Sequence, residues 1–358
     1  MTTASTEPQA AASPGREASA TTSATPTAVA PAPLEVDDAS ELDETASTID
    51  DRISNYTASL SSSVVDYPTE YGRRYHAYQA GAYLAPNDET EIDRLDFNHT
   101  LVVKAIGGKL FLAPVPEKKT HRILDMGTGT GIWAIEAADL FPNAEVIGND
   151  FSAIQPGWVP PNVKFEIDDV EQPWVNPSKY DFIFCRYMAG SIADWPKLMG
   201  NVYENANPGG WVEFQDYNLL WESTDGSLTD DHHSLRWSKL LNEACEKFGK
   251  EPCPGPKLEG WVKDAGFVNV THQKFKIPVG PWPKDPHYKD LGMRNMIQVL
   301  NGLEGFTLRA FIGVLGWTQE EVQVLLAHVR REMKSGAFHA QMDLHVVYAQ
   351  KPEAEEEE

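Results

Sequence analysis

The sequence predicts an α/β fold, in which a mostly parallel sheet of seven strands carries helices on both faces. Three observations support this fold class. Five short segments between residues 122 and 215 have the length and composition of strands, and two more follow at 268–277 and 339–348. A glycine-rich turn joins the first strand directly to a helix. Acidic residues end the next two strands, at the edge where open α/β sheets bind ligands.

The first strand, 122–126, runs into a glycine turn and then into a helix that begins near Ile132. Glycine lets the backbone approach a ligand closely. The dinucleotide fingerprint G-x-G-x-x-G would need glycine at position 132, so that pattern fails. The sequence instead reads G-x-G-x-G with Asp125 two residues before it, which resembles motif I of the S-adenosylmethionine-dependent methyltransferases. This resemblance implies that the turn passes under the methionine part of the cofactor and that Asp125 anchors the loop and the amino group. The turn residues expected to bind are Gly127, Thr128, Gly129 and Gly131.

The second and third strands, 144–150 and 163–167, end in acidic residues. Asp150 stands about 20 residues beyond the glycines, where an open α/β sheet places a carboxylate that accepts two ribose hydroxyls. The methyltransferase pattern has an acid for the adenine amino group after the third strand, where Asp168 and Asp169 stand, and Asp169 fits it better. Each acid alone suits a turn or a helix cap. Their order and spacing together predict a cofactor site.

The fourth and fifth strands are expected at 180–185 and 210–215. The fifth is introduced by N-P-G-G at 207–210, a turn that is frequent in the same superfamily. Arg186 follows the fourth strand, and it either faces the cofactor pocket or pairs with an acid.

The composition excludes several classes of protein. The net charge of the 358 residues is −23, and ten acidic residues against one basic residue stand in 1–51. No cluster of Lys and Arg is present, which argues against direct binding to nucleic acid. No apolar run is long enough to span a membrane, and the three cysteines lack the spacing of a zinc site or a disulfide framework. We therefore expect a cytoplasmic protein without a metal centre.

The chain divides into three parts. Residues 1–55 are rich in Ala, Ser, Thr and Pro and lack large apolar side chains, so we expect a disordered acidic arm. Residues 66–352 form the predicted catalytic domain, with an N-terminal helical cap at 66–115, a cofactor-binding core at 120–216 and a substrate cap with the last strands at 217–352. Residues 353–358 are an acidic tail, which is either solvated or docks on a basic protein. Any protein partner is expected at these acidic termini.

An aromatic and basic stretch at 71–78 precedes a predicted helix at 89–107, which Asn87 or Asp88 can cap. Two interpretations remain open for this region. It is either a helical layer packed on the sheet, or a cap that closes over the cofactor. In the second case Arg73 offers its guanidinium to the methionine carboxylate.

Longer motifs resemble one family within the superfamily. From residue 71 to residue 352 the chain is similar to the fungal LaeA-like methyltransferases. The resemblance rests on G-R-R-Y-H-A-Y at 72–78, P-N-D-E-T-E at 86–91, L-D-M-G-T-G-T-G-I-W-A-I at 124–135, I-Q-P-G-W-V-P-P-N-V at 154–163, G-S-I-A-D-W at 190–195 and G-W-T-Q-E-E-V at 316–322. It implies a Rossmann-like class I methyltransferase fold with an inserted helical cap. Members serve fungal secondary metabolism, some as pathway enzymes and the founding member as a nuclear regulator.

Helices are expected after the fifth strand at 234–250, 286–300 and 318–334. As insertions between the fifth and sixth strands they would lie over the carboxyl edge of the sheet and line an acceptor pocket. The aromatic side chains of this region are expected mainly in its core, and the pocket mouth is expected to be apolar.

Methyl transfer to a hydroxyl would gain from a general base. His232 and His233 stand after the fifth strand and are candidates, although each could instead cap the helix or pair with an adjacent aspartate. Asp216 and Tyr187, at the ends of the fifth and fourth strands, are rival candidates.

The sequence thus supports three hypotheses. The leading one is an S-adenosylmethionine-dependent methyltransferase that acts on a small-molecule acceptor, through a hydroxyl, in fungal secondary metabolism. The second is a LaeA-type regulator, nuclear rather than cytoplasmic, that works through a protein complex. The third keeps fold and cofactor but catalyses a cyclisation.

Overall fold

The computed structural model describes residues 62–174 and 178–354, which belong to one compact unit. The predicted arm, 1–55, and most of the predicted tail, 353–358, lie outside the described residues. Within the described part of the chain, no helix is long and apolar enough to cross a membrane.

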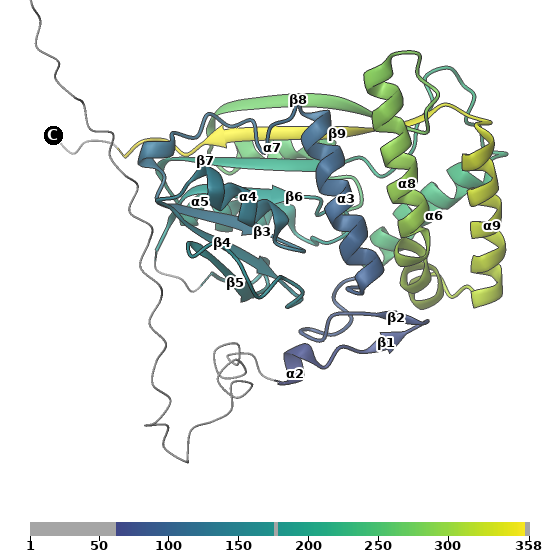
Figure 1. The fold of residues 1–358 in the computed structure, drawn as a ribbon, viewed down its shortest axis with the longest axis horizontal. Coiled ribbons are helices and arrows are strands. Elements are labelled where there is room, and N and C mark those ends of the chain that lie inside the picture. Colours follow the sequence, from purple (N-terminus) through teal and green to yellow (C-terminus); the bar gives the residue numbers. More distant parts are fainter. Residues whose placement is uncertain (1–61, 175–177, 355–358) are drawn as a thin grey trace, which may run out of the picture. The chain divides into compact units, whose positions relative to one another are not determined.

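Seven strands form one sheet in the order β5-β4-β3-β6-β7-β9-β8 (Figure 1). The strands from β5 to β7 are parallel, whereas β9 is antiparallel to both β7 and β8. The mostly parallel seven-stranded sheet predicted from the sequence is therefore confirmed. The strands are β3 (Arg122–Met126), β4 (Glu145–Asp150), β5 (Val163–Ile167), β6 (Tyr180–Arg186), β7 (Ala206–Tyr217), β8 (Val268–Val279) and β9 (Ala340–Gln350).

The longer helices of the described chain follow the predicted periodic segments, with two additions. They are α3 (Glu89–Ala105), α4 (Ile132–Leu140), α5 (Trp195–Asn205), α6 (His233–Lys247), α7 (Leu258–Asp264), α8 (Pro286–Leu308) and α9 (Gln319–Ser335). Asp88 caps α3 by accepting the backbone N–H of Glu91, and Thr318 forms a capping box at α9. The short helices α5 and α7 were not predicted.

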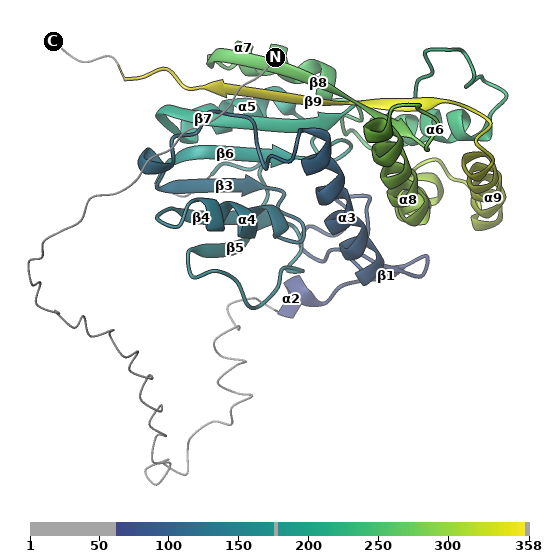
Figure 2. The same cartoon turned by 45° about the horizontal axis from the view of Figure 1, so that its top comes forward.

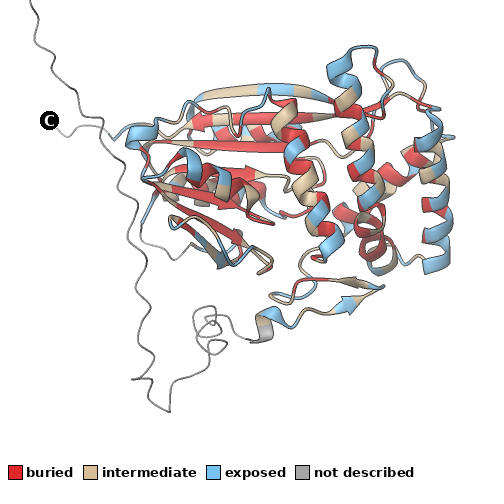
Figure 3. Ribbon diagram, viewed as in Figure 1, coloured by how far each residue is buried: buried red, intermediate tan, exposed pale blue. Residues whose placement is uncertain are grey.

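Alternate residues of the central strands pack on opposite faces of the sheet. Ile123 belongs to the face covered by α4, where the ring of Trp133 stacks on Phe184 with centroids 3.9 Å apart. Leu124 belongs to the other face, which α5 and α7 cover. The central strands are consequently buried along nearly their whole length (Figure 3). This two-sided burial explains why they read as continuous apolar runs.

The strand order reverses at β3. From β3 the chain steps outward to β4 and β5, and then returns to β6 on the other side. Open α/β sheets bind ligands at the carboxyl ends of the strands that flank such a reversal. Here that place lies between β3 and β6, and it is covered by α3 (Figure 2).

The helices α6, α8 and α9 stand together beyond the carboxyl ends of the parallel strands (Figure 1). They share one apolar core with α3 and with the ends of β7 and β9. Of the α-helices, only α6 and α7 come between the fifth and sixth strands, because α8 and α9 connect β8 to β9. The expected position of all three cap helices between those two strands is thus corrected.

Helix α8 also runs further than predicted, to Leu308, and continues as a π-helix at Arg309–Val314. Gly302 and Gly305 lie in the part of α8 beyond the predicted end. A methyl group at Gly302 would collide with side chains of Phe306 and of Arg94 on α3. These glycines therefore allow α3 and α8 to pack closely.

The segment before α3 contains a short helix, α2 (Ser62–Val65), and the two-stranded β1 (Thr69–Glu70) and β2 (Arg73–Arg74). It is tied to the distant π-helix, since Arg309 pairs with Glu70 at 2.7 Å and lies over the ring of Tyr75.

Candidate functional site

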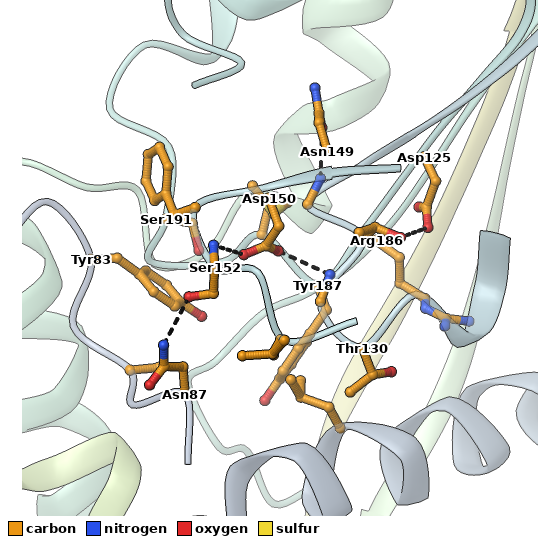
Figure 4. Close-up of a pocket in the computed structure, with 18 of the residues that line it drawn as sticks. Tyr83, Asn87, Asp125, Thr130, Asn149, Asp150, Ser152, Arg186, Tyr187 and Ser191 are labelled. Carbon is orange, nitrogen blue, oxygen red and sulfur yellow. Dashed lines mark hydrogen bonds between the residues drawn. The ribbon is translucent and has the colours of Figure 1, made fainter. Parts of the chain in front are cut away.

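A cavity, here called the strand-end cavity, opens at the carboxyl ends of β3, β4 and β6 (Figure 4). Nine of the residues singled out in the sequence line it: Asp125, Gly127, Thr128, Gly129, Asp150, Asp168, Asp169, Arg186 and Tyr187. Segments far apart in the chain are thus brought to one place, as expected for the carboxyl edge of a parallel sheet.

The glycine turn has a backbone that only glycine adopts easily. Gly127, Gly129 and Gly131 have φ values of 66°, 57° and 81°. Gly131 does not line the strand-end cavity but precedes α4, where a side chain would collide with the ring of Phe165. The turn is also held to α3, because the hydroxyl of Thr130 donates to Asp96 at 2.6 Å.

Two buried carboxylates organise the turn. Asp125 accepts a hydrogen bond from the hydroxyl of Thr128 at 2.6 Å. Asp150 accepts the backbone N–H of Gly129 at 2.9 Å and that of Ser152 at 3.0 Å (Figure 4). Burial raises the pKa of Asp125 to about 7 and that of Asp150 to about 6. Both acids are therefore poised to be stabilised as carboxylates by a cationic or hydroxyl-bearing ligand.

The two acids after β5, Asp168 and Asp169, differ in how many hydrogen bonds they accept from the protein. Asp169 accepts bonds from the side chains of Gln79 at 3.1 Å and Gln172 at 3.2 Å, and from the backbone N–H of Glu171. Asp168 accepts the backbone N–H of Asp169 at 2.8 Å. Both line the cavity, so either can face a ligand, and Gln79 links this end to the segment before α3.

Arg186 lies between Asp125 and α3. Its Nη2 donates to Nδ1 of His99 at 2.7 Å, and Nε2 of His99 lies 3.1 Å from the carboxylate of Glu136. Burial, and then the charge of Arg186, lower the pKa of His99 to about 3, so the imidazole is neutral. Nη1 of Arg186 is buried and has no hydrogen-bond partner among the described residues. A buried unsatisfied cationic donor beside a cavity calls for an anionic ligand group.

A second cavity, here called the apolar cavity, adjoins the first. The two share Tyr83, Ala85, Glu91 and Tyr187 as wall residues. Most of its lining is apolar and comes largely from the segment after β7 and from α6 and α8, including Leu219, Trp221, Trp237, Leu241, Val299 and Phe306. Trp221 and Trp237 also belong to the helical core, as expected for the aromatic residues of this region.

The polar groups of the apolar cavity form one network. Arg94 donates to both carboxylate oxygens of Glu91, at 2.9 and 2.6 Å, and to the side-chain oxygen of Gln298 at 3.0 Å. Burial opposes the charge on Arg94, but the adjacent carboxylate outweighs it and raises the pKa of the guanidinium. Arg94 also lies over the rings of Tyr187 and Phe306. The charged pair is therefore fixed between α3 and α8.

Tyr187 stands on the wall between the two cavities and has a φ of 63°. Such a conformation costs about 1–3 kcal/mol in a residue other than glycine and is frequent at functional sites. Burial raises the pKa of its phenol, so the hydroxyl is protonated at neutral pH. Its position between the cavities suits contact with both a cofactor and an acceptor.

Besides Gly131, four predicted site residues line neither cavity. The ring of His232 meets Phe338 edge-on, and the ring of His233 stacks on His328. Asp216 is buried and accepts the backbone N–H groups of the turn after β6, including that of Met188 at 2.8 Å. Arg73 forms a two-bond ion pair with Asp88. We therefore expect none of these four side chains to contact a ligand directly.

Sequence reasoning missed several wall residues. Glu91, Arg94 and Gln298 come together only through the packing of α3 on α8. His99 and Asn98 face the cavity from α3, and Ser152 and Asn87 bond to each other across it at 3.2 Å (Figure 4). The family motif P-N-D-E-T-E at 86–91, with Arg94 three residues later, was the signal that could have pointed to Asn87, Glu91 and Arg94.

Comparison with known proteins identifies the family. A model described as a methyltransferase domain matches residues 97–272. "Methyltransferase pytC" of Aspergillus terreus is 50% identical over 295 residues, which cover 82% of this chain and 91% of that protein. "Secondary metabolism regulator LAE1" of Cochliobolus heterostrophus is 35% identical over 79% of this chain and 94% of that protein. The chain belongs to the LaeA-like family of methyltransferases. "Protein-methionine methyltransferase laeA" of Emericella nidulans is also 35% identical, over 79% of this chain and 76% of that protein.

Membership confirms the resemblance drawn from the sequence and makes S-adenosylmethionine the cofactor. The residues present fit this group. The cavity offers an unpartnered guanidinium nitrogen for its carboxylate and buried acids for its ammonium and ribose groups. The LaeA-like family nevertheless joins proteins named as enzymes and proteins named as regulators, so it does not fix the acceptor.

Proposed function

We propose that the protein binds S-adenosylmethionine in the strand-end cavity and transfers the methyl group to a hydroxyl of a small molecule held in the apolar cavity. The observation that carries the proposal is the shared wall of the two cavities, formed by Tyr83, Ala85, Glu91 and Tyr187. Methyl transfer needs donor and acceptor to meet at one point, with water excluded. Two adjoining cavities, one lined by the glycine turn and the strand-end acids and the other mainly by apolar side chains, provide such a point.

The proposed cofactor contacts follow from the walls of the strand-end cavity. Asp125 holds the ammonium group, and Arg186 offers Nη1 to the carboxylate. Asp150 accepts the ribose hydroxyls, and Asp168 or Asp169 receives the adenine amino group. The backbone of Gly127, Thr128 and Gly129 lies under the cofactor, and Gly131 shapes the turn. The bound cofactor supplies an electrophilic methyl group, so the chain has to position the acceptor and receive its proton.

The biological setting is proposed from the relatives. The A. terreus relative is named a methyltransferase. Four further relatives carry names that refer to regulation of secondary metabolism. We propose that this protein serves as a methyltransferase in a fungal secondary metabolite pathway. Its partners would then be the small-molecule acceptor and the cofactor, and it would act in the cytoplasm.

A LaeA-type regulator that acts through a protein complex is the second candidate, because relatives with that name match at 34–35% identity. The two functions differ in what a deletion strain would lose. Loss of one methylated metabolite supports the enzyme, whereas loss of transcripts from several metabolite clusters supports the regulator.

Calorimetry tests the cofactor assignment directly. The purified chain should bind S-adenosylmethionine and S-adenosylhomocysteine, and should not respond to NADH. Tight binding of NADH without a response to the other two ligands would contradict the proposal. Incubation with S-adenosylmethionine and hydroxylated aromatic or polyketide-like compounds, followed by mass spectrometry, then tests for a mass gain of one methyl group.

A further inference from the structure

The apolar cavity contains one balanced pair of charges. Among the residues that line it, Arg94 is the cation and Glu91 is the carboxylate, and they are joined by two hydrogen bonds. Both side chains are almost fully buried, at 2% and 4% exposure. The remaining lining is mainly apolar. A ligand with a net charge would leave water for a place without a free counter-charge, at a large cost. The cavity therefore favours a neutral and largely apolar acceptor.

Of this pair, only Glu91 lies at the junction, which is the wall that the two cavities share. It lines both cavities, whereas Arg94 lines only the apolar one. Each carboxylate oxygen accepts one bond from Arg94, which leaves further acceptor capacity on both oxygens. The other polar side chains shared by the cavities are the phenols of Tyr83 and Tyr187. Burial raises the pKa of both phenols, so they are donors at neutral pH.

We infer that Glu91 is the group that recognises the acceptor hydroxyl, and that the acceptor is a neutral apolar molecule carrying a phenol or an enol. This inference rests on the proposed function and assigns a residue and a substrate class to it. Arg94 holds the carboxylate with two hydrogen bonds and is itself held by Gln298, while the phenol of Tyr187 lies beside the same junction. No histidine is needed for this role.

The proton and the electrons balance. The acceptor hydroxyl gives its proton to the Glu91 carboxylate, and its oxygen forms a bond to the methyl carbon. The bond from that carbon to sulfur breaks, and sulfur keeps the electron pair. The products are a methyl ether and S-adenosylhomocysteine, and the proton passes from Glu91 to solvent.

The test uses the full chain saturated with S-adenosylhomocysteine and three naphthalene probes that differ in one substituent. These are 2-naphthol, 2-methoxynaphthalene and 2-naphthoate, and their binding is followed by fluorescence and calorimetry. The wild type should bind 2-naphthol at least tenfold more tightly than the other two, because only 2-naphthol is a neutral hydrogen-bond donor. Equal binding of 2-naphthol and its methyl ether, or tighter binding of 2-naphthoate, would overturn the inference.

The variant Glu91→Gln should lower the affinity for 2-naphthol about tenfold and leave that for 2-methoxynaphthalene unchanged. Because this change leaves Arg94 without its charged partner, a second variant, Glu91→Leu with Arg94→Met, removes both charges and keeps the side chains apolar. It should fold and lose the preference for 2-naphthol. The matched control is Asp88→Asn, which breaks a neighbouring ion pair but retains a capping side chain for α3. It should keep the preference.

The affinity for S-adenosylhomocysteine distinguishes a failure of the inference about Glu91 from a failure of the proposed function. If the wild type and all variants bind S-adenosylhomocysteine but the hydroxyl preference persists without Glu91, the inference fails and the proposed function stands. If the wild type does not bind S-adenosylhomocysteine, the proposed function fails as well. Methylation of 2-naphthol by the wild type, with a fall in kcat of about tenfold or more in Glu91→Gln, would extend the support to turnover.

Discussion

The buried carboxylate of Asp125 predicts that cofactor affinity falls as the pH is lowered. Its folded pKa of about 7 lies far above the ordinary value of 3.8, so the acid is largely protonated in the free protein below pH 7. An ammonium group placed against it stabilises the ionised form, and binding must then release the proton. Between pH 7.5 and pH 6 the ionised fraction falls from about three quarters to about one tenth, so the affinity should fall about eightfold.

Calorimetry of S-adenosylmethionine binding, in two buffers with different ionisation enthalpies, counts the released protons. Asp125 alone should release about 0.9 proton at pH 6 and about 0.25 at pH 7.5. Asp150, with a pKa of about 6, adds at most a further twofold loss of affinity at pH 6. In Asp125→Asn the affinity at pH 7.5 should fall about tenfold or more, because a charge-assisted bond is lost. Between pH 7.5 and pH 6 the affinity of this variant should fall only about twofold, which is the contribution of Asp150.

Two results would refute this reasoning. One is a wild-type affinity that is the same at pH 6 and pH 7.5. The other is an Asp125→Asn variant that keeps the eightfold dependence, which would place the titrating group elsewhere. Thermal unfolding without cofactor, measured at both pH values, controls for partial unfolding of the variant.

Three further predictions concern other parts of the chain. Asp150→Ala should weaken S-adenosylmethionine binding by roughly 10- to 150-fold with little change in the thermal midpoint of the free protein, because relief of a buried charge offsets two lost backbone bonds; wild-type affinity would reduce Asp150 to a turn residue. Deletion of residues 1–55 should leave the thermal midpoint and cofactor affinity intact, since that segment lacks large apolar residues; a clear loss of stability would show that it packs on the body. His232→Ala and His233→Ala should each retain kcat within about twofold, because neither ring lines a cavity; a loss of 100-fold in either would restore the general-base hypothesis.

The strands of the sheet were predictable because the signals that mark each of them lie within a short stretch of the chain. Buried parallel strands are apolar on both faces, so β3, β4 and β6 appear as short and mainly apolar runs. The edge where ligands bind follows from the residue at which each run ends, which is why Asp150 was found by its spacing, whereas Asp125 and Asp169 were found through the resemblance to the methyltransferase pattern. The glycine turn adds a conformation that few other residues adopt.

The cap was less predictable because its contacts join distant parts of the chain. Gln298 lies 204 residues from Arg94, and no periodic pattern indicates that they meet. The glycines of α8 allow close packing against Arg94 and Glu91 of α3, which lie about 200 residues away in the chain. His232 and His233 stand near the end of β7 in sequence, but the start of α6 directs them to Phe338 and to α9. Sequence distance from a strand end therefore says little about direction once a helix intervenes.

The buried pair of Glu91 and Arg94 bears on the choice between enzyme and regulator. A buried ion pair is weak evidence for stability, because well-packed apolar side chains of similar volume often serve equally well. This pair lies beside a cavity and forms part of the wall that the apolar cavity shares with the strand-end cavity. Tyr187, with a strained backbone, stands on the same wall. A protein that acted only by docking to partners would gain nothing from a neutralised charge and a strained tyrosine between two cavities. Recognition of a small acceptor would use both the buried ion pair and the strained Tyr187. Their place between the two cavities therefore favours the enzyme over the regulator.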